Sequence, residues 1–242
     1  MPQMKILFLF SLIIFSTKCT TEIDNYKELL RLFEKGEKTN DYLIKALDML
    51  SQKNNHQFQD NFEKNKEAFM KHKTTLTENN GFIEDQENYR DMYYGKYEIS
   101  HNGSGPIAVF NLFYLLTKRT DLDLSIFIQI LEKNGIVLDG MCTSMIAIAK
   151  YFKDLGYVPL SSSNLYDFNK IGRETYASIL SVYNPNIYYW SNAIRFWAIS
   201  KENGKYYVHN NEDGSPKIAY DSITDILQKT GMKYIYLTGV YR

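Results

Sequence analysis

The sequence has few cysteines, no net charge and no long apolar run. Its 242 residues include two cysteines, Cys19 and Cys142, and 28 basic residues balance 28 acidic ones. A neutral chain without basic clusters has no electrostatic attraction to nucleic acid or to an anionic membrane surface, so neither is an expected partner. If Cys19 is lipid-modified or removed, no internal disulfide can form, and stability must come from a hydrophobic core.

The spacing of the cysteines and histidines gives no support for a metal site. Neither a Cys-x-x-Cys nor a His-x-x-x-His pattern occurs in the chain, and these are spacings at which such residues bind zinc. We therefore expect no metal ion and no cofactor. The overall balance of 44% hydrophobic and 23% charged residues is that of an ordinary globular protein.

The N-terminus has the pattern of an export signal. Lys5 precedes the apolar run Ile6–Phe15, and small or polar residues follow in Ser16–Thr21. This is the order of a secretory signal, and the run is shorter than the roughly 20 apolar residues that span a bilayer. Cys19 stands where a bacterial lipoprotein carries its lipid. We expect residues 1–21 to be a signal peptide or lipoprotein signal, and the protein to be secreted or lipid-anchored through Cys19.

The following segment, residues 22–95, has the pattern of several short helices. Apolar residues recur at helical spacing in Tyr26–Lys35 and Asp41–Leu50. The stretch His56–Lys73 is highly charged, with a thin seam of aromatic residues. This pattern predicts a helical N-terminal extension that packs onto the main domain.

From residue 96 to residue 242 a group of helices is followed by strands. Helices are predicted over Pro106–Leu116 and Leu124–Leu131, and Thr143 or Ser144 can cap a third. Helices followed by an antiparallel sheet predict an α+β fold, and Asn203-Gly204 between two strands is a strong hairpin signal. The predicted strands are Tyr157–Leu160, Ala177–Tyr183, Ala193–Ser200, Lys205–Asn210 and Lys233–Val240.

A glycine-flanked serine opens the first of these helices, in the segment Asn102-Gly103-Ser104-Gly105-Pro106-Ile107-Ala108. A nucleophile at a helix N-terminus is favoured by the helix dipole, and the glycines allow close substrate approach. The segment resembles the nucleophile turn of papain-like cysteine peptidases, especially the bacterial C39-like ones, which read NGCG-P-x-A. The resemblance extends over about residues 86–240 and implies a papain-like domain over residues 96–242.

The resemblance also assigns family roles to residues that differ from those of the family. Three of the four positions carry a substitution, which implies a natural pseudoenzyme rather than a working hydrolase. The matching positions are Ser104 for the nucleophilic Cys, Arg195 for the basic His, Glu98 for the oxyanion Gln and Asn210 or Asn211 for the orienting residue. Because Glu98 and Arg195 have opposite charges, we expect them to form an ion pair or to share a polar network through Ser104. The alternative is that Arg195 points outward and Glu98 lies in a solvated loop.

These substitutions remove the general base. A serine hydroxyl needs an adjacent base to take its proton, and arginine is always charged and only donates hydrogen bonds. His101, three residues before Ser104, could replace the base in a tight turn. His209 is expected on the face of its strand opposite to Asn210, and Cys142 is expected to be a small buried residue.

Three functions therefore follow from the sequence. The chain is a degenerate peptidase that binds a peptide or protein, an active serine- or cysteine-type peptidase or amidase, or a non-catalytic interaction or immunity-type protein that uses its N-terminal helices. The surroundings of Ser104 discriminate among them. An open groove without a base favours the first function, a histidine within hydrogen-bond reach the second, and a filled cleft the third.

We predict that the exported protein lacks the residues before Cys19 or carries lipid on Cys19, because the short apolar run after Lys5 has the pattern of a cleaved signal. Mass spectrometry of the protein recovered from the producing cells measures this. Recovery of an exported chain that still begins at Met1 would contradict the prediction.

Overall fold

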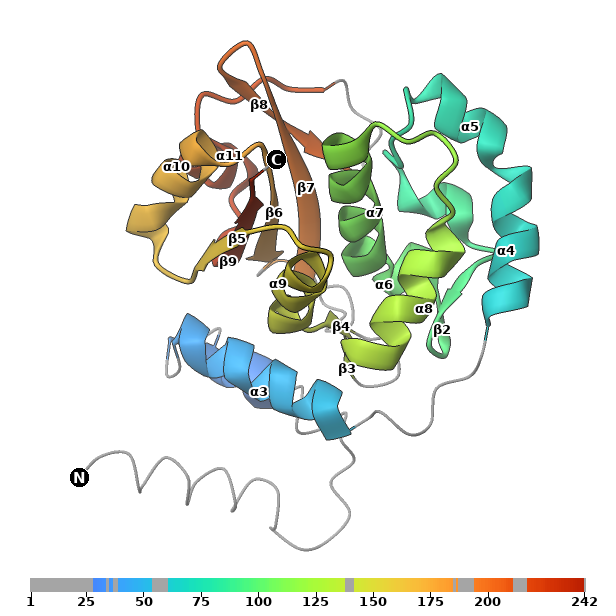
Figure 1. The fold of residues 1–242 in the computed structure, drawn as a ribbon. Coiled ribbons are helices and arrows are strands. Elements are labelled where there is room, and N and C mark those ends of the chain that lie inside the picture. The colour runs from blue at the N-terminus through green and yellow to red at the C-terminus, as the bar shows by residue number, and fades with distance from the viewer. Residues whose placement is uncertain are drawn as a thin grey trace, which may run out of the picture.

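The fold is α+β: one antiparallel sheet carries helices on both of its faces (Figure 1). The expected signal, residues 1–21, and Asn211 lie outside the described residues. The structure is a computed structural model that describes residues 28–33, 35–36, 39–53, 61–137, 142–184, 186, 194–210 and 217–241.

The sheet has five strands in the order β5-β9-β6-β7-β8, and every neighbouring pair is antiparallel. The β7–β8 hairpin turns at Asn203 and Gly204, whose φ angles of 50° and 77° are the positive values that a tight two-residue hairpin turn requires. The predicted strands are confirmed with small shifts at their ends. They are β5 (Pro159–Ser162), β6 (Ala177–Tyr183), β7 (Ile194–Glu202), β8 (Lys205–His209) and β9 (Lys233–Val240).

The helices predicted before the sheet are present. Ser144 caps α9 by accepting a hydrogen bond from the Ala147 backbone N–H, as its position in the sequence indicates. The larger helices are α3 (Asn40–Lys53), α4 (Phe62–Lys71), α5 (Lys73–Glu78), α7 (Ser104–Thr117), α8 (Leu124–Asn134) and α9 (Met145–Asp154). Short elements connect them: η1 (Gln86–Tyr89), β1 (Tyr93–Tyr94), β2 (Tyr97–Glu98), α6 (Ile99–Asn102), β3 (Ile136–Val137) and β4 (Cys142–Thr143).

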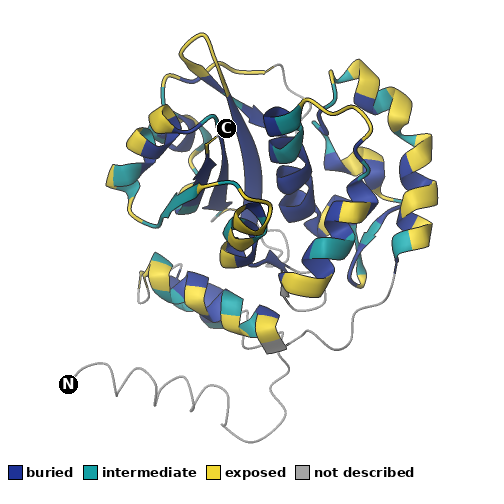
Figure 2. Ribbon diagram, viewed as in Figure 1, coloured by how far each residue is buried: buried dark blue, intermediate teal, exposed yellow. Residues whose placement is uncertain are grey.

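Two helices that the sequence argument did not anticipate cover the second face of the sheet. They are α10 (Leu165–Glu174) and α11 (Ile223–Thr230), and they lie across the sheet from α7 and α8 (Figure 1). As a result β7 is buried on both faces from Ile194 to Ser200 (Figure 2). Ile194 and Phe196 belong to the core that contains α7, whereas Trp197 belongs to the core formed with α10 and α11.

The N-terminal helices share the core of the main domain. Leu43 and Leu47 of α3 and Phe69 of α4 belong to the same buried cluster as Phe110 of α7 and Phe196 of β7. The segment predicted as an extension therefore packs into the main domain. No helix within the described parts of the chain is long and apolar enough to cross a membrane.

Replacing either Phe110 or Trp197 by alanine should destabilise the fold by about 3–5 kcal/mol, because both aromatic side chains lie in a core. Tyr166, which is 93% exposed, provides the control, and its replacement by alanine should cost less than about 0.5 kcal/mol. Urea unfolding followed by circular dichroism measures all three. A cost below about 1 kcal/mol for either core variant would contradict the assigned packing.

Candidate functional site

Ser104 is the first residue of α7, directly after the single turn of α6. The Gly103 N–H donates to the Ile99 carbonyl at 2.8 Å, and the Gly103 carbonyl accepts from the Ile107 N–H at 3.0 Å. The chain therefore passes from α6 into α7 without an open loop. Ser104 lies at a helix N-terminus, as the sequence predicts, but it is only 4% exposed.

Residues of β1 and β4 cover this turn. A side chain at Gly105 would overlap the Thr143 side chain of β4, so the glycine is required by the close approach of these two segments. The Thr143 hydroxyl lies 3.1 Å from the Tyr94 hydroxyl, and the Tyr94 carbonyl accepts from Asn102 Nδ2 at 3.3 Å. Burial raises the pKa of Tyr94 well above its ordinary value. The space beside Gly105, which could have held a substrate, is occupied by the Thr143 side chain.

No histidine of the described residues hydrogen-bonds to Ser104, because each has partners elsewhere. His72 Nε2 lies 2.7 Å from an Asp91 carboxylate oxygen. His101 Nδ1 lies 3.2 Å from the Ser100 hydroxyl, and its side chain is 62% exposed. His209 contacts an acid and a serine described below. His56, the fourth histidine, lies outside the described residues.

The strand register places Arg195 on the face of the sheet away from α7. Side chains alternate along a strand, and Ile194 and Phe196 point toward the core of α7. Arg195 pairs with Val182 of β6, whose side chain lies in the core of α10 and α11. The expected placement of Arg195 beside Ser104 is therefore wrong. A shift of one residue in a strand moves every side chain to the other face.

Glu98 does not form the expected ion pair with Arg195; neither of these described residues contacts the other through its charge. A Glu98 carboxylate oxygen accepts from the Ser100 hydroxyl at 3.4 Å and lies 4.0 Å from His101 Nδ1. The Glu98 side chain is 43% exposed, whereas Arg195 is 6% exposed. The acid therefore stays near water, and the expected polar plug of Glu98, Ser104 and Arg195 is not formed.

Asn210 orients a different part of the chain from the one that the family resemblance implies. It follows β8 with a positive φ of 65°. Its side-chain Nδ2 donates to Gln86 Oε1 at 3.2 Å, and Gln86 Nε2 donates to the Ser100 carbonyl at 2.6 Å. Asn210 thus connects the end of β8 to η1 and α6.

His209 was expected on the face opposite to Asn210, and its partners could not be predicted from any local pattern. It pairs with Ala198, which itself pairs with Ile179 in the core of α7. His209 therefore lies on the α7 face of the sheet. Its ring nitrogens contact Glu84 and Ser200, each at 2.8 Å.

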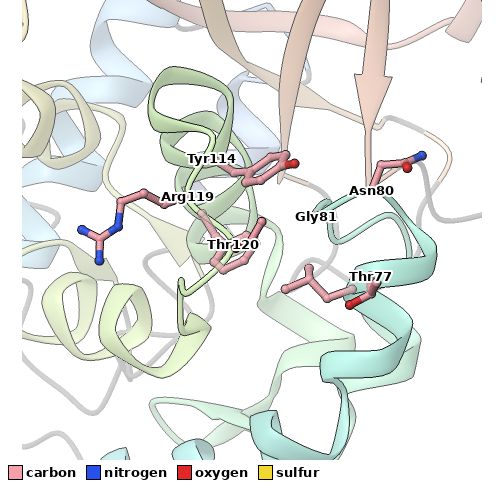
Figure 3. Close-up of a pocket in the computed structure, with 8 residues that line it drawn as sticks. Thr77, Asn80, Gly81, Tyr114, Arg119 and Thr120 are labelled. Atoms are coloured by element: carbon pink, nitrogen blue, oxygen red, sulfur yellow. The ribbon is translucent and has the colours of Figure 1, made fainter.

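A surface hollow of about 250 Å³ lies between α5 and α7 (Figure 3). Its apolar part is formed by Leu76, Phe110 and Tyr114, and its polar rim by Thr77, Asn80, Gly81, Arg119 and Thr120. The Arg119 side chain extends away from Thr77 and Gly81 (Figure 3) and binds Asp121 through two hydrogen bonds of 2.9 and 2.7 Å.

A second hollow, of about 290 Å³, lies between α3, α8 and α9. Asp48 on its wall is held by the Ser144 hydroxyl at 2.8 Å and by Gln52 Nε2 at 2.9 Å, and Lys150 binds Asp154 at 2.9 Å. Its charged groups are therefore already paired. No cluster of three or more candidate metal-ligating side chains occurs within the described ranges.

Comparison with known proteins gives structural similarity at low sequence identity. No protein-family model matches the sequence, and no curated protein matches it. The peptidase domain of Streptococcus ComA, a bifunctional ABC transporter involved in quorum sensing, superposes with a TM-score of 0.42 and 12% sequence identity. The similarity covers 62% of this chain and 98% of that domain. Its low TM-score means that it assigns neither a fold family nor a function to this chain.

Proposed function

We propose that this chain is a non-catalytic interaction protein, built on a degenerate papain-like peptidase domain, that binds a peptide or protein outside the former catalytic turn. The observation that carries the proposal is the burial of Ser104. The serine at the position that resembles a nucleophile is 4% exposed, and Thr143 of β4 closely approaches the next residue, Gly105. A filled site of this kind favours an interaction protein over an enzyme.

The absence of a base does not depend on the exact alignment of β7 with the peptidase pattern. The side chains of β7 that face α7 are Ile194, Phe196, Ala198 and Ser200, and none of them is a base that can activate a serine. Arg195, on the other face, has no acceptor atom. Either register therefore leaves Ser104 without the partner that a serine nucleophile needs.

We assign the partner to the hollow between α5 and α7. Its volume of about 250 Å³ is below the range of about 300–1,000 Å³ that is typical of small-molecule sites, so it suits a single side chain. The apolar rings of Phe110 and Tyr114 favour an aliphatic or aromatic residue of a polypeptide, and the hydroxyls of Thr77 and Thr120 can bind its backbone.

We further propose that this interaction takes place outside the producing cell or at its surface. The support is the N-terminal pattern of Lys5 followed by Ile6–Phe15. Cys142, the one described cysteine, is buried and is not part of a disulfide. The fold therefore depends on its cores and not on a disulfide, which suits either a secreted or a lipid-anchored form.

The variant Thr77→Trp should weaken the binding of peptides selected from a displayed random library by tenfold or more, since the indole would fill the hollow. Thr74→Trp is the matched control, because Thr74 is also exposed on α5 but does not line the hollow. Fluorescence anisotropy with the selected peptides measures both. Equal affinities for the two variants, or a selection that yields no binding peptide, would contradict the proposal.

A further inference from the structure

A buried chain of hydrogen bonds joins three segments that are far apart in the sequence. Glu84 Oε1 lies 2.8 Å from His209 Nδ1, and His209 Nε2 lies 2.8 Å from the Ser200 hydroxyl. Glu84 belongs to the segment between α5 and η1, His209 ends β8, and Ser200 lies in β7. His209 and Ser200 are 1% and 2% exposed. These hydrogen bonds therefore connect the N-terminal segment to the β7–β8 hairpin.

Further contacts attach residues 82–86 to the same hairpin. The Phe82 ring stacks on the His209 ring, with their centroids 3.9 Å apart. The Asn210 N–H donates to Glu84 Oε2 at 3.2 Å, and Lys217 Nζ lies 2.8 Å from Glu84 Oε1. One carboxylate thus accepts from three donors, and it is the centre of the attachment.

The order acid, histidine, serine is that of a hydrolase triad, but the surroundings exclude that chemistry here. Ser200 is 2% exposed, and Phe82 covers one face of the His209 ring. Neither of the two hollows described above includes Ser200 or His209. A substrate carbonyl cannot approach the hydroxyl in this arrangement. The cluster therefore serves the conformation of the chain.

At neutral pH the protonation state of His209 sets the direction of its two hydrogen bonds. Burial lowers the pKa of His209 below its ordinary value of 6.5, and Lys217 acts in the same direction, while Glu84 and Glu202 oppose them. The neutral ring then donates from Nδ1 to Glu84 and accepts from Ser200 at Nε2. Burial opposes ionisation of Glu84, but its hydrogen bonds and positive neighbours outweigh burial and lower its pKa below 4.5.

We propose that Glu84, His209 and Ser200 form an acid-sensitive clasp, which releases residues 82–86 from the β7–β8 hairpin when His209 takes up a proton. The released histidine is solvated and binds a proton more readily than the buried one. The closed form is therefore fully favoured above the ordinary pKa of 6.5 and loses stability as the pH falls below it. Glu84 adds to this loss below pH 4.5, because its pKa is also lowered in the closed form.

The charged groups around the clasp do not cancel this dependence. Besides Glu84, the ring of His209 is influenced by Lys217, which disfavours its protonation, and by Glu202, which favours it. Lys118 and Lys217 lie 6.0 and 4.8 Å from the centroid of Phe82, and both add positive potential near the ring. Protonation of His209 in the closed form therefore remains unfavourable. The clasp concerns the fold itself and does not depend on the proposed partner.

Hydrogen exchange at about pH 7 and about pH 5.5, corrected for the intrinsic rate at each pH, tests the clasp. In the natural protein, protection of the amides of residues 83–86 should fall about fivefold, since one histidine with a released pKa of 6.5 can supply at most about eightfold over this pH range, while protection in α8 stays within twofold. His209→Gln, whose amide can still donate to Glu84 and accept from Ser200, should keep its protection within twofold. His72→Gln is the control, and it should behave like the natural protein.

An unchanged protection of residues 83–86 in the natural protein would overturn the proposal, as would an equal loss in the His209→Gln variant. If circular dichroism shows that His209→Gln is unfolded at neutral pH, hydrogen exchange of the natural protein alone tests the proposal. A loss confined to residues 83–86 and the β7–β8 hairpin supports the clasp. A loss of the same size in α8 refutes it, because the whole domain would then be opening.

Discussion

The packing of α7 between the sheet and the other helices is the constraint on which the remaining structure depends. Eleven of the residues of α7 are buried, including Ser104 and Gly105 at its first turn. A helix that is apolar on nearly all sides must be enclosed on all sides, and here β7, α8 and the N-terminal segment enclose it. Asn111 on this helix binds both the N–H and the carbonyl of Ile83, at 2.9 and 2.8 Å. The N-terminal segment is thereby attached to the helix centre.

This enclosure restricts access to the turn that resembles a nucleophile site. A helix N-terminus favours a negative charge, but Ser104 is only 4% exposed and no base among the described residues hydrogen-bonds to it. The close contact of Gly105 with Thr143 replaces the space that a substrate needs. The polar groups that remain nearby, such as Gln86 and Asn210, bind each other. The proposed function therefore places the partner at the hollow between α5 and α7 and not at this turn.

Local signals in the sequence were enough to predict most elements, but not the faces to which side chains point. Asn203-Gly204 predicted the hairpin, and Ser144 predicted the start of α9, because turn chemistry and capping act over a few residues. The face of Arg195 could not be predicted in this way. Since β7 is covered on both sides, apolar residues occupy the consecutive positions Phe196, Trp197, Ala198 and Ile199, and no alternation fixes the phase.

The two sheet-covering helices and the clasp were beyond the sequence argument for different reasons. The helices α10 and α11 are only 10 and 8 residues long and lie between strands, where a strand-dominated pattern hid them. Glu84 and His209 are 125 residues apart, and no local rule connects residues at such a separation. Their pairing follows from how the N-terminal segment folds back over the sheet.

The reactivity of a thiol placed at Ser104 tests most directly whether the turn is sealed. In the Ser104→Cys variant, mass spectrometry can follow alkylation of this cysteine separately from that of Cys19 and Cys142, and Thr74→Cys supplies an exposed reference thiol. A sealed turn predicts a rate slower by on the order of a hundredfold than that of the reference, because the reagent must wait for local opening. Alkylation of Ser104→Cys as fast as the reference, or faster, would show an open and activated site and would contradict the account.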